Sequence, residues 1–175
     1  MYRLTNPLIW LLRFRHRCGY GVHSPFAFRF ITGVIYENTA YYAYRELDRT
    51  PPFSDRFRVR KILHLLFRIS NWSQPDVIAC LSSSDNVAKY LTAGCRKAQM
   101  ADYVPDGEID LCWLDKPNND VLPHLHEHSV LVIDHLNKNR EWFRSLPAVV
   151  TFDLYDVGIA FFDAKYNKQH YIVNF

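Results

Sequence analysis

The sequence has no apolar run long enough to cross a membrane. Near the N-terminus the longest unbroken stretch of aliphatic and aromatic residues covers residues 8–12, whereas a membrane-spanning helix needs about 20 such residues. No basic segment leads into an apolar stretch with a small-residue cleavage site, so we expect no signal peptide. These absences predict a chain without a membrane span and a cytoplasmic location.

Closely spaced cysteines are also missing. The four cysteines are Cys18, Cys80, Cys95 and Cys112, and no two of them form a Cys-x-x-Cys pair. Because zinc-binding motifs use such pairs, we expect no metal held by these cysteines. Cys80 and Cys112 lie within apolar, strand-like runs, so the predicted role of the cysteines is that of small buried hydrophobic side chains in a reducing compartment.

The formal net charge is only +3, but the positive and negative side chains are distributed unevenly along the sequence. Residues 1–68 hold 12 Lys and Arg against 4 Asp and Glu, and the remainder holds 9 against 14. The basic half interleaves arginine with aromatic residues, a pattern typical of a surface that binds a protein or a nucleic acid. Arginine stems that cover an amphipathic helical layer, such as residues 8–17, produce the same pattern.

Apolar material is plentiful, since 49% of the residues are hydrophobic and 15% are aromatic. Ser24 and Pro25 are typical of a helix start, and helical spacing of apolar residues continues through the first part of the chain. After Pro75, apolar runs and helical patterns alternate, which predicts an α/β fold with a mostly parallel sheet. We therefore expect an N-terminal helical layer, residues 1–74, and a sheet domain, residues 75–175.

The expected elements can be placed by residue number. Helices are predicted at residues 26–36, 56–69, 84–92 and 139–146, and strands at residues 77–81, 95–100, 109–114, 130–133, 149–154, 158–162 and 170–175. Residues 164–169 are too few for a parallel crossover between the last two strands. We therefore expect these C-terminal strands to form an antiparallel pair.

Three acidic residues follow predicted strands: Asp102, Asp115 and Asp134. Ligands of open parallel sheets bind beyond the carboxyl ends of the strands, so these side chains are candidates for a binding site. Asp102 lies about 20 residues after the first strand, where a dinucleotide site places its ribose-binding carboxylate. The alternative is that these aspartates only cap the helices that follow.

The loop after the first strand reads Ser82, Ser83, Ser84 and Asp85, without glycine. A cofactor-binding turn needs glycine because the backbone must bend tightly and approach the ligand closely. The serine hydroxyls remain able to donate hydrogen bonds, and Ser84 or Asp85 is able to cap the next helix. Helix capping is the simpler interpretation.

A histidine-rich segment, residues 124–128 (HLHEH), is the second candidate for a metal site. On a strand, its three histidines would share one face. Pro123 precedes the segment and a predicted strand follows it, which favours a solvated loop or a frayed helix end without a bound metal.

Two stretches resemble a known family. Residues 17–30 (RCGYGVHSPFAFRF) and residues 151–175 (TFDLYDVGIAFFDAKYNKQHYIVNF) resemble the ends of small bacterial S-adenosylmethionine (SAM)-dependent methyltransferases. The strings GYGVHSPF and DVGIAFF carry most of this resemblance. Residues 130–136 (VLVIDHL) are similar to the family's strand with a double-acid ending, here Asp134 and His135.

The resemblance implies a Rossmann-like methyltransferase sheet with SAM bound after the first strand. Ser82, Ser83, Asp85 and Asp102 would then contact the cofactor, and Asp115, Asp134 and His135 would face the methyl acceptor as catalytic residues. Too few residues separate Asp102 from Ile109 for the family's next helix and strand, so we expect a trimmed sheet.

Taken with the glycine-free loop, these features predict a methyltransferase-like protein whose SAM binding is weak or lost. The alternative function is that of a non-catalytic domain, derived from a methyltransferase, that binds a protein or a nucleic acid through its basic N-terminal half.

Overall fold

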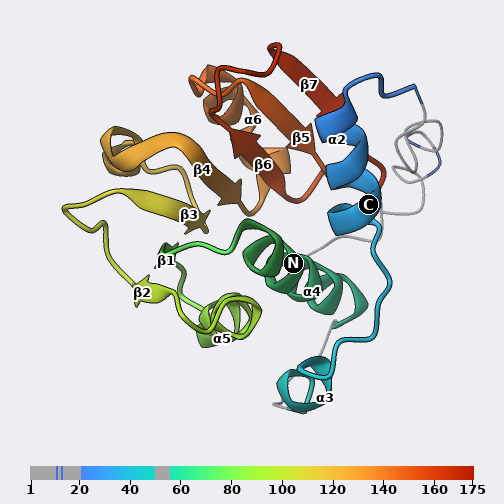
Figure 1. Ribbon diagram of the computed structural model, residues 1–175, viewed down its shortest axis with the longest axis vertical. Coiled ribbons are helices and arrows are strands. Elements are labelled where there is room, and N and C mark those ends of the chain that lie inside the picture. The colour runs from blue at the N-terminus through green and yellow to red at the C-terminus, as the bar shows by residue number, and fades with distance from the viewer. Residues whose placement is uncertain (1–10, 12, 14–20, 50–55) are drawn as a thin grey trace.

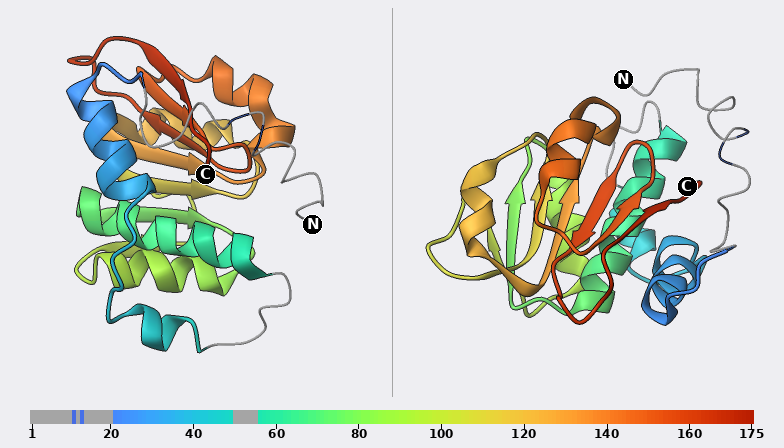
Figure 2. Two further views of the ribbon diagram at one scale, coloured as in Figure 1. Left: turned by 90° about the vertical axis from the view of Figure 1, so that its right-hand side faces the viewer. Right: turned by 90° about the horizontal axis from the view of Figure 1, so that it is seen from above.

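The computed structural model describes residues 21–49 and 56–175, together with Leu11 and Arg13. The rest of the amphipathic stretch at residues 8–17 lies outside the described residues. The described chain folds into one seven-stranded sheet with helices on both faces (Figures 1 and 2). None of its helices is both long and apolar enough to span a bilayer.

In the described part of the N-terminal layer, helix α2 (Pro25–Phe30) begins where the sequence predicts a helix start. It has Ser24 as its N-cap, and the Ser24 hydroxyl accepts a hydrogen bond from the Ala27 N–H. The helix continues as a π-helical turn, η2 (Ile31–Ile35). A short helix, α3 (Tyr44–Leu47), and a long one, α4 (Arg56–Ser73), complete the layer.

The remaining elements alternate as the sequence predicts, with shifted boundaries. The helices are α5 (Asp85–Gly94), η3 (Asn119–His124) and α6 (Leu136–Ser145). The strands are β1 (Val77–Leu81), β2 (Gln99–Ala101), β3 (Ile109–Leu114), β4 (Leu125–Ile133), β5 (Val150–Asp153), β6 (Gly158–Phe161) and β7 (Gln169–Ile172). Residues 102–108, between β2 and β3, contain no helix or strand.

The sheet is mostly parallel, with the order β2-β1-β3-β4-β6-β5-β7. Only β6 runs against its neighbours β4 and β5. The prediction that the last two strands pair with each other is wrong, because β7 pairs with β5 instead, in parallel. Residues 162–168 carry the chain past β5 to its far side. Seven extended residues span up to about 23 Å, whereas two strand spacings need only about 10 Å.

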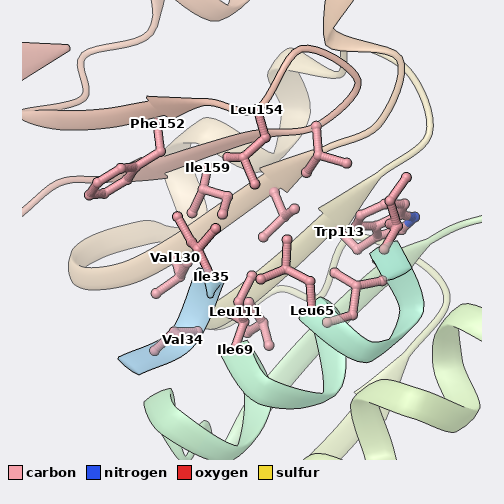
Figure 3. Close-up of a cluster of buried hydrophobic side chains, with 14 of the residues drawn as sticks. Val34, Ile35, Leu65, Ile69, Leu111, Trp113, Val130, Phe152, Leu154 and Ile159 are labelled. Atoms are coloured by element: carbon pink, nitrogen blue, oxygen red, sulfur yellow. The ribbon is translucent and has the colours of Figure 1, made fainter. Parts of the chain in front are cut away.

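Alternate residues along the strands face two separate cores. On one face, strand side chains pack against α2, η2, α4 and α5. The close-up shows the part of this core that lies between the strands, η2 and α4 (Figure 3). The labelled members include Leu111, Val130 and Ile159 from the strands and Leu65 and Ile69 from α4. This core joins residues of the two predicted regions, and the boundary between residues 74 and 75 stays a prediction.

The opposite face of the sheet is covered mainly by α6. Its Leu136 and Phe143 pack with Cys112, Leu131 and Ala160 from the strands. Period-two alternation therefore places Leu111 and Cys112, or Val130 and Leu131, in different cores. This two-sided burial explains why the strands appear in the sequence as nearly continuous apolar runs.

Helix α2 is attached to the far end of the chain by aromatic side chains. The ring centroid of Phe30 lies 5.0 Å from those of both Phe152 and Phe161. Phe26 contacts the edge of Phe161 and stacks on Tyr166 at 4.2 Å. These contacts join the N-terminal layer to β5 and β6. The left view of Figure 2 shows α2 beside this part of the sheet.

Candidate functional site

A pocket of about 410 Å³ lies at the carboxyl ends of β1, β3 and β4, and we refer to it as the strand-end pocket. The sheet order reverses here, because β1 is followed by β2 on one side and has β3 on the other. Such a reversal is where open α/β sheets bind their ligands. The pocket brings together five of the seven predicted site residues: Ser82, Ser83, Asp115, Asp134 and His135.

The other two predicted residues, Asp85 and Asp102, are not among those that line the pocket. Asp85 is the first residue of α5, and Asp102 is exposed just after the edge strand β2. A role for Asp102 in holding a ribose stays a prediction. Ser84 has the extended backbone of an N-cap residue before Asp85, but its hydroxyl makes no capping hydrogen bond.

The Asp115 carboxylate, just after β3, is hydrogen-bonded to the serine loop that follows β1. Its oxygens accept hydrogen bonds from the Ser82 hydroxyl at 3.0 Å and from the Ser83 backbone N–H at 2.8 Å. The Trp113 indole N–H donates to the same carboxylate at 2.9 Å. The Ser83 hydroxyl adds a further bond at 3.2 Å. Asp115 therefore holds the serine loop closed, and its role as a catalytic residue stays a prediction.

The loop has its own internal support as well. The Ser82 hydroxyl accepts a hydrogen bond from the Ser84 N–H at 3.1 Å. Glycine would leave the amides of this turn pointing at a ligand, but here Asp115 and Ser82 accept from two of them. The serine side chains thus take part in a closed hydrogen-bond network with a carboxylate at its centre.

Asp134 and His135 form the polar end of the pocket. His135 Nδ1 lies 2.9 Å from Asp134 Oδ2, and the His135 N–H donates to Asp134 Oδ1 at 2.7 Å. The His135 backbone is left-handed, with φ 53° and ψ 36°, a conformation that a histidine adopts only at some cost. Asn139 supports it, because its side-chain amide donates to the His135 carbonyl at 3.2 Å.

One wall of the pocket is apolar and comes from α4. Val59, Ile62 and Leu63 line this side, opposite Trp113 of β3. Sequence reasoning missed these four residues as site residues. Helical apolar spacing indicates that α4 has a buried face, but spacing alone does not show that part of this face borders a pocket.

The buried cysteines confirm their predicted structural role for the part of the chain that the structure describes. Cys80, Cys95 and Cys112 are all buried and unbridged. Burial, with a smaller effect of the Asp115 and Asp102 charges, raises the pKa of Cys80 to about 12. Cys80 is therefore a thiol at neutral pH and a poor nucleophile, although it lies close to the pocket.

The histidine segment differs from the predicted loop or helix end, because only His124 ends a helix and the rest belongs to β4. The strand is paired with β3 here, with an irregular register. His126 contacts Asp110, with His126 Nε2 3.1 Å from Asp110 Oδ1, and the rings of His126 and His128 lie 6.0 Å apart. Among the described residues, no three metal-binding side chains are grouped to hold an ion.

Comparisons with known proteins assign no family. No family model, no curated protein and no solved structure matches the chain. The function is therefore argued from the strand-end pocket, and the resemblance to methyltransferases stays a prediction.

Proposed function

We propose that this chain is a SAM-dependent methyltransferase-like protein whose cofactor site is degenerate. Three features support the proposal: the mostly parallel sheet, the pocket at its order reversal, and the polar residues at the carboxyl ends of β1, β3 and β4. Residues 102–108 lead directly from β2 to β3, without the helix and strand that the family places there, although the sheet still has seven strands because β7 lies beyond β5.

The observation that carries the degenerate site is the Asp115 carboxylate in the serine loop. A cofactor with an amino-acid carboxylate needs free backbone N–H groups at this turn. The Ser83 N–H already donates to Asp115 at 2.8 Å, and the negative charge of Asp115 repels a second carboxylate. The residues present therefore do not fit SAM in the way that the resemblance implies.

We expect SAM to bind with a dissociation constant no better than about 100 μM, or roughly −5.5 kcal/mol. A single hydrogen bond from the ribose to Asp102 contributes roughly 1.5–3 kcal/mol, which does not offset the cost of association. Asp134 and His135 would still offer a polar surface to a second ligand, and His135 remains the candidate base.

Isothermal titration of the purified protein with SAM tests the proposal. The variant Asp115→Asn removes the charge and keeps the shape, so SAM should bind about five- to tenfold more tightly if charge repulsion weakens binding. Asp106→Asn, the same change in an exposed loop, is the matched control and should leave the affinity unchanged.

One result would reverse the proposal. Saturable binding of SAM by the unmodified protein at low micromolar concentration, abolished by Asp102→Ala, would show that the serine loop has rearranged around the cofactor. An active methyltransferase would then be the better description.

A further inference from the structure

A second cleft, of about 620 Å³, lies between α4 and the segment of residues 35–48, and we refer to it as the α4 cleft. It shares no lining residue with the strand-end pocket. Phe57 and Arg60 of α4 line the α4 cleft, whereas Val59 and Ile62 line the pocket. One helix therefore separates two cavities of different chemistry.

Basic side chains follow the cleft side of α4. Arg60, His64 and Arg68 all line the cleft and are four residues apart, so they lie above one another on one helical face. Lys61 lines the cleft beside them. The uneven charge of the sequence is thus partly concentrated at one cavity.

Arg68 is the unusual member of this row, because its residue is only 7% exposed. Its guanidinium donates to the carbonyls of Val34 at 2.6 Å and Ile35 at 3.2 Å. Within the described residues it forms no ion pair with a carboxylate, and its bonds to Val34 and Ile35 go to neutral carbonyls at the end of η2. An anion that entered the cleft would add the opposite charge that carbonyl acceptors do not give to a buried cation.

The two acids that line the cleft are engaged by other groups. Asp48 Oδ1 accepts a hydrogen bond from the Tyr90 hydroxyl at 2.5 Å and lies 3.0 Å from His64 Nε2. Both oxygens of Glu37 accept from the Tyr41 hydroxyl, at 2.8 and 2.9 Å. Burial, together with Glu37, raises the pKa of Tyr41 to about 12, so this hydroxyl remains a donor at neutral pH.

We propose that the α4 cleft binds the phosphate group of a phosphorylated small molecule. Guanidinium groups match phosphate oxygens in planar, paired hydrogen bonds, and Arg60 and Arg68 supply two such groups on one helix face. The cleft volume lies within the range of small-molecule sites. The exposed ring of Phe57 lines the same cleft, whereas one face of Tyr44 is covered by the His64 ring, stacked on it at 3.8 Å.

Calorimetric titration with inorganic phosphate, adenosine diphosphate and adenosine tests this site. Binding of the diphosphate and of phosphate, without binding of adenosine, is expected. Arg60→Gln should weaken the diphosphate about tenfold, because it removes one charged partner. Arg96→Gln is the matched control at an exposed position outside the cleft, and it should leave the affinity unchanged.

Arg68→Lys provides a second variant that keeps the charge and removes the planar fork. It should weaken the diphosphate, while circular dichroism confirms that the variant is folded. Equal binding of adenosine and adenosine diphosphate, an affinity unchanged by Arg60→Gln, or no binding of the diphosphate at millimolar concentration would each overturn the proposal.

Titration with a single-stranded oligonucleotide tests whether the cleft instead binds the phosphates of a nucleic acid. Affinity that rises with oligonucleotide length and falls equally in Arg60→Gln and Arg96→Gln would identify an extended nucleic-acid surface, and would overturn the small-molecule site. The Asp115→Asn variant should not alter diphosphate binding, so the two cavities can be judged separately.

Discussion

Replacing Asp153 with asparagine removes the charge that joins two arginines at the end of β5. The carboxylate is 2% exposed. Arg13 Nη1 lies 2.9 Å from Asp153 Oδ1, and Arg140 pairs with the other oxygen. Both guanidinium groups also lie over the ring of Tyr155, whose N–H donates to Asp153 Oδ1 at 2.7 Å.

The size of the effect follows from burial. Removing one partner of a fully buried ion pair costs about 3–5 kcal/mol. The Arg13 and Arg140 side chains are 14% and 27% exposed, so water partly compensates them when the charge is lost. We therefore expect Asp153→Asn to lower the free energy of unfolding by roughly 2–4 kcal/mol, and the melting temperature by roughly 4–16 °C.

The effect should depend on pH in a defined direction. Burial opposes ionisation of Asp153, but Arg13, Arg140 and the Tyr155 N–H outweigh it and lower the pKa of Asp153 below 3.8. A lowered pKa in the folded state stabilises the protein above the unfolded pKa of about 3.9, and the stabilisation is lost as the pH falls through the folded value. The difference between the two proteins should be constant from pH 7 to pH 5 and shrink below about pH 4.

Urea unfolding followed by circular dichroism at several pH values measures this difference. Asp76→Asn is the matched control, because its pair with Lys97 is exposed and should contribute less than about 1 kcal/mol. A loss below about 1 kcal/mol at pH 7, or a difference that stays constant down to pH 2, would refute the ion-pair explanation.

Two further substitutions test the packing of α4. Gly94→Ala should destabilise the protein by roughly 1–3 kcal/mol in thermal unfolding. The reason is that a Cβ at Gly94 would lie 2.4 Å from the Phe67 carbonyl oxygen and 2.8 Å from the Ser70 Cβ. An unchanged melting temperature would contradict the close approach of α4 and α5. Gln74→Gly should stabilise the protein by about 0.5–1 kcal/mol, because Gln74 has the left-handed φ of 48° that glycine adopts without strain. The Gln74 N–H donates to the Ser70 carbonyl at 3.0 Å and so ends α4. A lower melting temperature would show that the contacts of the Gln74 side chain stabilise the protein by more than its backbone strain costs.

The pattern of buried strands could be predicted from the sequence because these strands are buried on both faces. Residues 109–114 and 130–133 are such apolar runs, and both appear as strands. The partner of β7 could not be predicted in this way. Its position depends on the path of residues 162–168 around β5, and no local sequence pattern indicates that path.

The candidate site, too, could be predicted from the sequence only in part. Ser82, Asp115 and Asp134 meet because the ends of neighbouring parallel strands lie at one edge of the sheet. The engagement of Asp115 by the serine loop depends on the direction of one side chain, which spacing does not determine. The α4 cleft escaped prediction because its two sides, α4 and residues 35–48, come together only through the tertiary fold.

Because α2 packs against β6 through aromatic contacts, it cannot complete its packing until β6 has been synthesised on the ribosome. Phe26 and Phe30 pack against Phe161, which is added roughly 130 residues after Phe30, or roughly 6–26 s later at bacterial and eukaryotic elongation rates. Throughout that interval the apolar face of α2 lacks its native partner on β6. The nascent chain therefore exposes this helix to chaperones and to premature association, and the N-terminal layer completes its packing only after β6 has emerged.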